Sequence, residues 1–129
     1  MDTARFEMTF RKDQEHLVEQ VIEFDSINKV SEGILCGITD IDFGGYDEIV
    51  KLHKLGVVFY GSHGSGYEFC EGVFACDGKS LIYTKAIYGS PAIVITEDLQ
   101  IDPHYAREIQ DYWRIYRTVN NGFHNLVLK

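Results

Sequence analysis

Alternation of apolar and polar residues at the start of the chain predicts a β-strand. From Arg5 to Arg11 every second side chain is apolar, so the apolar side chains share one face of an extended chain. The spacing then becomes helical, and Asp13 is placed to cap a helix that we expect to run to about Phe24. The apolar face of this predicted helix consists of Leu17, Val18, Val21, Ile22 and Phe24.

Glycines separate the next three predicted elements. Residues 33–43 have the composition of a second strand, which a pair of glycines ends. Residues 46–55 predict a short helix, and Gly56 stands where a left-handed C-terminal cap belongs. Residues 57–60 are apolar throughout, which indicates a buried strand.

The middle of the chain is rich in aromatic and β-branched residues and predicts adjacent strands. Residues 67–76 and 80–88 are of strand length, and Asp77-Gly78 between them is a strong hairpin signal. A Gly-Ser-Pro turn precedes a further predicted strand over 92–96. Strands joined by such short turns indicate an antiparallel meander.

The end of the chain predicts a long helix and a last strand. Asp102-Pro103 combines a capping carboxylate with proline at the first helical position, and the helix is expected to reach about Thr118. An Asn-Asn-Gly sequence then precedes a predicted strand over 123–128. We therefore expect residues 1–129 to form a single α+β domain. Its mostly antiparallel sheet of about five to seven strands would be covered by two main helices and one short helix.

Aromatic residues in the last predicted helix admit two interpretations. Tyr and Trp beside Arg are typical of protein interfaces, but an aromatic stripe at helical spacing is more often part of a core. We expect Ile109, Tyr112 and Tyr116 to be in the core, with Tyr105 and Trp113 at its margin.

Composition excludes several classes of protein. The chain has 129 residues, of which 45% are hydrophobic and 25% charged, so it is not expected to be disordered. Its net charge of −8 disfavours direct binding to nucleic acid or to an anionic membrane surface. Three cysteines in no disulfide framework, together with no visible signal peptide or membrane span, lead us to expect a cytoplasmic protein with free thiols. No sequence pattern implies a cofactor.

Acidic residues are concentrated in the first half of the chain. On the first predicted helix Glu15, Glu19 and Glu23 lie one turn apart, and no Lys or Arg occurs between Asp13 and Asp25. The same half of the chain contributes four more acidic candidates, Asp40, Asp42, Asp47 and Glu48.

This acidity leads to our first hypothesis, a non-catalytic module that binds a basic protein surface. Such a module would act as a small inhibitor or adaptor, and mimicry of nucleic-acid charge is one form of it. A merely solvated acidic face is the simpler alternative.

Two carboxylates of this set have a further interpretation. Asp40 and Asp42 are two residues apart in a predicted strand, so their side chains point the same way. Such a pair can bind a hard cation or divide acid and base roles. A solvated strand end that runs into a turn accounts for them as well.

The glycine-rich stretch Gly61–Gly66 gives the alternative hypothesis, a small-ligand or hydrolytic site. Its candidate ligand residues are Ser62, His63, Gly64 and Ser65. The stretch lacks the Lys-Ser/Thr ending of a P-loop and is predicted to join two strands, so a simple hairpin loop explains it too.

A nucleophile reading of the same region pairs Cys70 with His63 as its base. In an extended strand over 67–76, however, Cys70 shares a face with Phe74 and Cys76. A face of that kind is typical of a core, where cysteine behaves as a small hydrophobic residue.

Two further possibilities concern metals and self-association. His53, His63, Cys70 and Cys76 do not form the closely spaced pairs of a zinc site, so no metal site is predicted. A homodimer that pairs an exposed strand edge, with 123–128 as the candidate, remains open.

Overall fold

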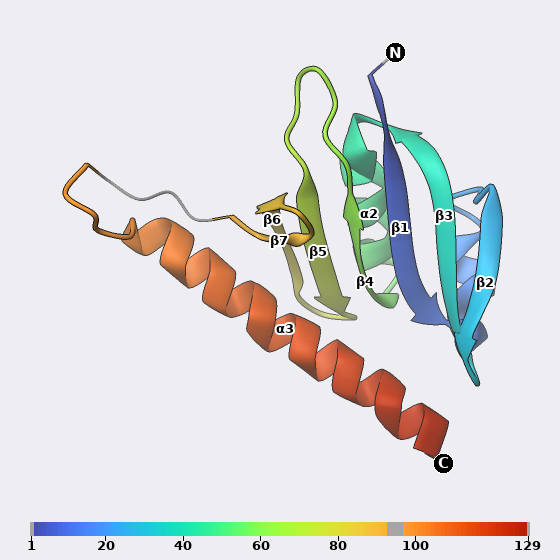
Figure 1. Cartoon of the computed structure of the whole chain (residues 1–129). Helices are drawn as coiled ribbons and strands as arrows, with labels where there is room; N and C mark the ends of the chain where they lie inside the picture. Colours follow the sequence, from blue (N-terminus) through green and yellow to red (C-terminus); the bar gives the residue numbers. More distant parts are fainter. Residues whose placement is uncertain (1, 93–96, 129) are drawn as a thin grey trace.

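The structure is a computed structural model that describes residues 2–92 and 97–128. Seven strands, three α-helices and two short 3-10 helices (η) follow one another along the chain (Figure 1). In chain order these are β1 (Thr3–Arg11), η1 (Lys12–Gln14), α1 (Glu15–Val18), β2 (Ser26–Ser31), β3 (Ile34–Asp42), η2 (Phe43–Gly45), α2 (Tyr46–Lys54), β4 (Val58–His63), β5 (Gly72–Asp77), β6 (Leu81–Ile87), β7 (Ser90–Pro91) and α3 (Pro103–Leu128).

The seven strands form one sheet in the order β2-β3-β1-β4-β5-β6-β7, and every neighbouring pair is antiparallel. The predicted α+β class with a mostly antiparallel sheet is therefore confirmed. β1 lies at the centre because it pairs with β3 on one side and with β4 on the other. The register aligns side chains of one face in rows across the strands, and one such row is Ile38, Glu7, Ser62, Val73 and Thr84.

The alternation in β1 determines which face of the sheet packs against α1 and α2. Phe6, Met8 and Phe10 have no exposed surface, and they pack with Phe59 of β4 and Phe74 of β5. The helices contribute Val18, Ile49 and Leu52 to this core. Its other members are Ile22, Val57 and Cys76. The intervening polar residues of β1 therefore face the opposite side of the sheet.

The opposite face is only partly covered, by α3. A stripe of buried residues on α3 packs against β5 and β6, and it consists of Tyr112, Ile115, Val119 and Phe123. Near its C-terminal end α3 reaches the start of β3, where Phe123 joins the same cluster as Ile34. Figure 1 shows α3 crossing the sheet obliquely, so that the other ends of β1 and β3 remain uncovered. Ile109 and Tyr116, expected in the core, are half-buried, as are Tyr105 and Trp113 at its margin.

Local sequence signals predicted several boundaries correctly. The helix α2 ends just before Gly56, which has a φ of +77° as its capping role requires. The Asp77 side chain accepts hydrogen bonds from the backbone N–H groups of Lys79 and Ser80 and so closes the β5–β6 hairpin. At the start of α3, Asp102 accepts a hydrogen bond of 2.8 Å from the backbone N–H of His104.

The predicted first helix over 13–24 is wrong in its extent. Helix α1 ends at Val18, and only turns continue the chain to residue 21. Asp13 caps no helix, because its carboxylate pairs with Arg11 at 3.0 Å. The apolar residues of the segment still reach the core, since Val18 and Ile22 are buried without a continuous helix.

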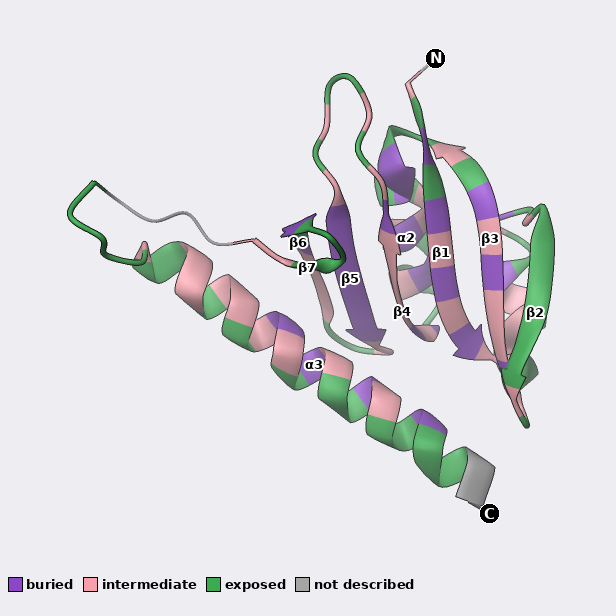
Figure 2. Cartoon of the chain, in the orientation of Figure 1, coloured by how far each residue is buried: buried purple, intermediate pink, exposed green. Residues whose placement is uncertain are grey.

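Two strand predictions also require correction. Strand β2 was not predicted, because five of its six residues are exposed and its apolar residues do not alternate (Figure 2). Conversely, the strand predicted over 67–76 is confined to Gly72–Asp77 of β5, and residues 67–71 form a loop. The strand predicted over 92–96 falls mostly outside the described residues, and the preceding Ser90–Pro91 forms β7.

The last predicted strand, 123–128, belongs to a helix instead. Helix α3 continues through the Asn-Asn-Gly sequence to Leu128. Buried Val119 and Phe123 lie on either side of that sequence and share one face of the helix, so packing against the sheet outweighs the local tendency to stop. A homodimer contact through a strand over 123–128 is therefore not available, because these residues are helical.

Candidate functional site

The row of glutamates predicted along the first helix, Glu15, Glu19 and Glu23, is not continuous. Glu15 and Glu19 lie one turn apart, linked by a hydrogen bond from the Glu19 N–H to the Glu15 carbonyl oxygen. Glu23 lies beyond the end of α1, in the segment that leads to β2. Among the residues that the structure describes, none of these three carboxylates takes part in an ion pair.

The other four acidic candidates lie where β3 ends and α2 begins. Asp40 and Asp42 are exposed on β3, and the register places their side chains on the face that carries Glu7 of β1. Asp47 and Glu48 occupy the first turn of α2, where negative charge stabilises a helix through its dipole. Helix stability thus explains Asp47 and Glu48, whereas it does not explain Asp40 and Asp42.

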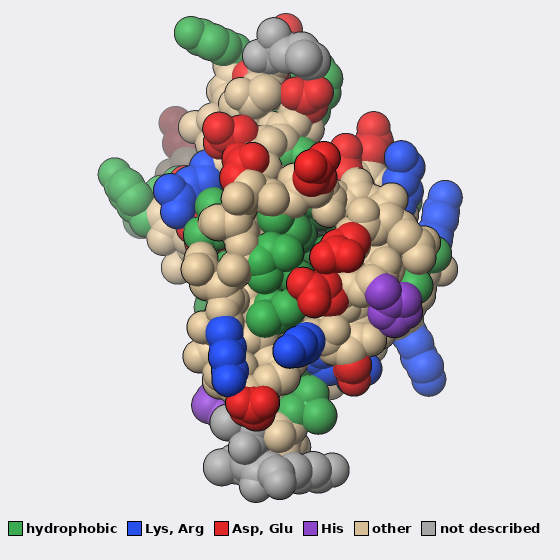
Figure 3. All heavy atoms as spheres, turned by 90° about the vertical axis from the view of Figure 1, so that its right-hand side faces the viewer, with side chains coloured by type: hydrophobic (Ala, Val, Ile, Leu, Met, Phe, Trp, Pro, Cys, Tyr) green, Lys and Arg blue, Asp and Glu red, His purple; other side chains and the backbone are tan. Residues whose placement is uncertain are grey.

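The side of the molecule formed by β2 and β3 is acidic with apolar side chains at its centre. Figure 3 shows carboxylates over the upper and central parts of this side, around a strip of hydrophobic side chains, with Lys and Arg mainly lower and at the margins. The exposed hydrophobic residues of β2 are Ile27 and Val30. An apolar centre with a charged rim is the anatomy of many protein interfaces.

His63, the base proposed for the alternative site, is enclosed. Only 2% of its surface is exposed, and its Nδ1 atom lies 2.7 Å from the carbonyl oxygen of Gly64. Because a carbonyl only accepts, Nδ1 carries the proton, and Nε2 accepts from the hydroxyl of Tyr83. Glycines fit closely around the ring, since a Cβ on Gly44 would lie 2.8 Å from the His63 Cε1 atom. Neither ring nitrogen is available to a substrate in this arrangement.

The other residues of the glycine-rich stretch do not form a site together with His63. Gly61, Ser62 and His63 are strand residues of β4, and only Gly64, Ser65 and Gly66 lie in the loop. Side chains alternate along β4, so Ser62 faces the side of α3 while His63 faces the side of α2. Asp40 and Asp42 are likewise on the face opposite to His63.

Cys70 was expected on a strand face beside Phe74 and Cys76, and this prediction is wrong. Cys70 is exposed in the loop before β5, whereas Cys76 is fully buried. Cys36, the third cysteine, is half-buried on β3. All three are free thiols.

Burial of His63 predicts a specific loss of stability in acid. Desolvation lowers the pKa of His63, although the Gly64 hydrogen bond and the Glu71 carboxylate oppose this. In the window between this lowered pKa and about 6.5, the unfolded chain binds more protons than the folded chain. The free energy of unfolding should therefore decrease as the pH falls below about 6.5.

The measurement is chemical denaturation of the wild type and of a His63→Gln variant at several pH values between 7.5 and 5.0. The stability advantage of the wild type should shrink toward pH 5.0, since the other titrating groups are common to both proteins. A difference between the two proteins that does not change with pH would contradict a neutral, buried His63.

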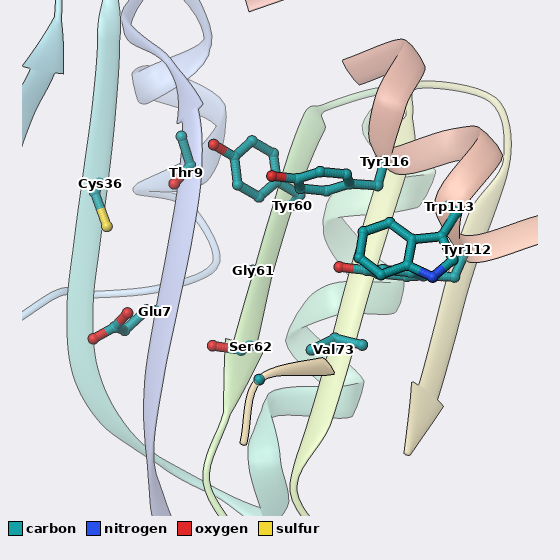
Figure 4. A pocket seen from close by; sticks show the side chains of 11 residues that line it. Glu7, Thr9, Cys36, Tyr60, Gly61, Ser62, Val73, Tyr112, Trp113 and Tyr116 are labelled. Carbon is teal, nitrogen blue, oxygen red and sulfur yellow. The ribbon is translucent and has the colours of Figure 1, made fainter. Parts of the chain in front are cut away.

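A cavity that the sequence did not reveal lies between α3 and the sheet. It has a volume of about 240 Å³, and its lining comes from β1, β3, β4, β5, α3 and the turn between β6 and β7. The residues that line it are Glu7, Thr9, Cys36, Tyr60, Gly61, Ser62, Val73, Gly89, Tyr112, Trp113 and Tyr116 (Figure 4). The alternation in β1 and the helical spacing in α3 indicated which residues share a face of each element. Only the packing of α3 on the sheet brings these two faces together around a cavity.

Burial shifts the pKa of three titratable groups in the cavity wall. Burial raises the pKa of Tyr112 to about 12 and also raises that of Tyr60. Burial raises the pKa of the Cys36 thiol as well, against the opposing effect of a hydrogen bond with Thr9. Glu7 supplies the one carboxylate among the lining residues.

Comparison with known proteins found no family model, no curated protein and no solved structure that matches this chain. Within residues 2–92 and 97–128, no group of three or more His, Cys, Asp and Glu side chains is arranged to hold a metal ion. None of the described helices combines the length and the hydropathy that crossing a membrane requires.

Proposed function

We propose that this protein is a non-catalytic binding module that docks a basic surface of another protein. The observation that carries this proposal is the uncovered part of the sheet beside α3. There Glu7, Asp40 and Asp42 share one face, next to a cavity with aromatic walls. A small inhibitor or adaptor acts through a surface of this kind.

The charges on this face support a basic partner. Opposite charges across an interface steer association and fix the orientation of the partners. Two arginines of β1 share this face, and both are already paired: Arg5 with Glu7 and Arg11 with Asp13, each at 3.0 Å. Asp40 lies opposite Arg5 in the register, while Asp42 lies opposite Thr3 and can meet a cation of the partner.

The geometry gives less support to a hydrolytic site on the glycine-rich stretch. Both ring nitrogens of His63 are hydrogen-bonded within the protein, and Ser62 points to the other face of the sheet. Cys70 lies in an exposed loop rather than on the strand face where it was expected. The stretch therefore lacks a nucleophile and a base that share one pocket.

The test compares two charge reversals of equal size on opposite faces. A partner captured from lysate at low salt would be identified, purified and titrated against the wild type, D40K/D42K and E19K/E23K. We expect D40K/D42K to weaken binding about tenfold or more at low salt, because it sets like charges against the partner. The effect should diminish as salt screens exposed charges.

The E19K/E23K variant is the matched control, since these two carboxylates lie on the segment that packs over the other face. It should retain binding within about twofold. Loss of binding in E19K/E23K with retention in D40K/D42K would transfer the site to the predicted Glu15, Glu19 and Glu23 surface. Binding that is insensitive to salt and to both reversals would overturn the proposed function.

A further inference from the structure

The cavity beside α3 has the chemistry of a site for one cationic side chain. Eleven residues line it, and they comprise one carboxylate, that of Glu7, and no Lys, Arg or His. Its volume of about 240 Å³ lies below the roughly 300–1,000 Å³ of pockets that bind drug-sized ligands. A single side chain therefore fits the cavity better than a cofactor does.

Oxygen atoms approach the cavity from both sides. Figure 4 shows the phenol groups of Tyr112 and Tyr116 extending from α3 toward β1, with the Ser62 hydroxyl and the Glu7 carboxylate on the strand side. Glu7 and Ser62 are direct neighbours in the register of β1 and β4. Hydroxyl and carboxylate oxygens accept hydrogen bonds, so this arrangement suits a group with several N–H donors.

The aromatic rings of α3 supply flat walls, with the Trp113 ring steeply inclined to the nearly parallel rings of Tyr112 and Tyr116. The Trp113 ring meets the Tyr112 ring at 71° with centroids 5.2 Å apart, and it meets the Tyr116 ring at 87° with centroids 5.8 Å apart. A cation placed over the face of such a ring is attracted by the quadrupole of the ring, most strongly for Trp. Glu7 then adds a full negative charge from the opposite side.

We propose that this cavity receives an arginine side chain of the basic partner, so the inference rests on the proposed function for the source of that arginine. A guanidinium is planar, stacks on aromatic rings and carries five donors in a fixed fork. The ammonium of lysine is a compact, strongly hydrated point charge. It suits acceptors on several sides of a cavity, and flat aromatic walls, less well than a guanidinium does. Insertion of such an anchor into a central pocket is typical of interface hot spots.

Arg5 of the protein itself competes with an incoming arginine for the Glu7 carboxylate. Its Nε and Nη2 atoms both contact the Oε1 atom of Glu7, at 3.1 and 3.0 Å, so Oε2 can accept a further hydrogen bond. This ion pair is exposed, with 66% of the Arg5 side chain accessible, and exposed pairs are weak. An incoming guanidinium can therefore share or replace Arg5 at Glu7.

The test uses a probe that does not depend on the partner, N-acetyl-arginine methylamide. Trp113 is the only tryptophan of the chain and lines the cavity, so its fluorescence reports occupancy directly. We expect a saturable change with a Kd of about 1 mM for a probe of this size. The citrulline analogue, which has the same shape without the charge, should cause no saturable change, and the lysine analogue should bind several-fold more weakly.

Variants distinguish a binding role of Glu7 from a structural one. Glu7→Gln should weaken the arginine probe about tenfold, because it removes the charged acceptor. Arg5→Ala should strengthen it several-fold by removing the competitor. Glu68→Gln, an exposed carboxylate outside the cavity lining, is the matched control and should leave the Kd unchanged. Thermal unfolding would confirm that each variant is folded.

Each outcome has a defined meaning. Equal responses to the arginine and citrulline probes, or no response at tens of millimolar probe, would overturn the cavity assignment. If the purified partner still bound and remained sensitive to D40K/D42K, the docking proposal would survive that failure. A saturable arginine response that weakens in Glu7→Gln and strengthens in Arg5→Ala would support the cavity assignment, even if no partner binding depended on Asp40 and Asp42.

Discussion

Substitution of Gly61 by alanine is expected to lower the free energy of unfolding by about 3 kcal/mol or more, because the strand has no room for a side chain there. A Cβ on Gly61 would collide with the carbonyl oxygen of Glu7 on the neighbouring strand and lie 2.7 Å from the Cζ atom of Phe74. Backbone cannot move aside as a flexible side chain can, so β1 and β4 would have to separate. Chemical denaturation of the wild type and the variant measures the loss.

Gly64→Ala is the control from the same glycine-rich stretch. A Cβ on Gly64 would meet no atom within 4 Å, so this variant should be as stable as the wild type or slightly more stable. A Gly61→Ala protein within about 1 kcal/mol of the wild type would show that β1 and β4 are less closely spaced than the structure indicates. The expected pair of results would assign Gly61 to sheet packing rather than to ligand binding.

Truncation of Phe74 to alanine is the second change with a large expected effect, a loss of about 3–5 kcal/mol in the free energy of unfolding. The Phe74 ring is fully buried, stacks on Phe6 with centroids 5.3 Å apart and meets Phe59 edge to face at 5.8 Å. It also fills the space above Gly61, its cross-strand partner. Removal of the ring leaves a cavity that rigid strands on both sides cannot close.

Phe74→Leu serves as the control, since it keeps most of the apolar volume and should cost clearly less than the alanine variant. Equilibrium denaturation followed by far-UV circular dichroism gives both values. Equal losses in the two variants would mean that the ring contacts with Phe6 and Phe59 contribute little. A loss below about 1 kcal/mol in Phe74→Ala would contradict its place at the centre of the core.

These two residues also explain why the glycine-rich stretch resembled a ligand site in the sequence. A glycine required by an approaching ligand and a glycine required by a neighbouring strand look the same along the chain. Gly61 is of the second kind, and Gly44 and Gly72 similarly make room for the ring of His63. The glycine-rich stretch was interpreted as a ligand site, whereas at Gly61, Gly44 and Gly72 the group that comes close is part of the protein itself.

Features that depend on neighbours in the chain were predictable from the sequence alone. The alternation of Phe6, Met8 and Phe10 specified a strand with one buried face, because successive side chains of a strand point to opposite sides. Gly56 and Asp102 marked helix ends through backbone hydrogen bonds and dihedral preferences that act within one turn. The α+β class followed from these local elements.

Only the tertiary structure decided features that depend on partners far away in the chain. Strand β2 forms because its backbone pairs with the edge of β3. The exposed residues of β2 show no sequence pattern that predicts this pairing. Helix α3 passes through Gly122 because Val119 and Phe123 gain more from the sheet than the glycine costs.

The candidate site was the least predictable part for the same physical reason. Glu7 and Trp113 are 106 positions apart in the numbering, and no local pattern connects them. They line one cavity because β1 occupies the centre of the sheet and α3 crosses only part of its face. The sequence by itself determined the α+β class, strand β1, helix α2, the start of α3 and the acidic charge. Long-range packing decided where β2 forms, where α1 and α3 end, and which charges and rings face one another.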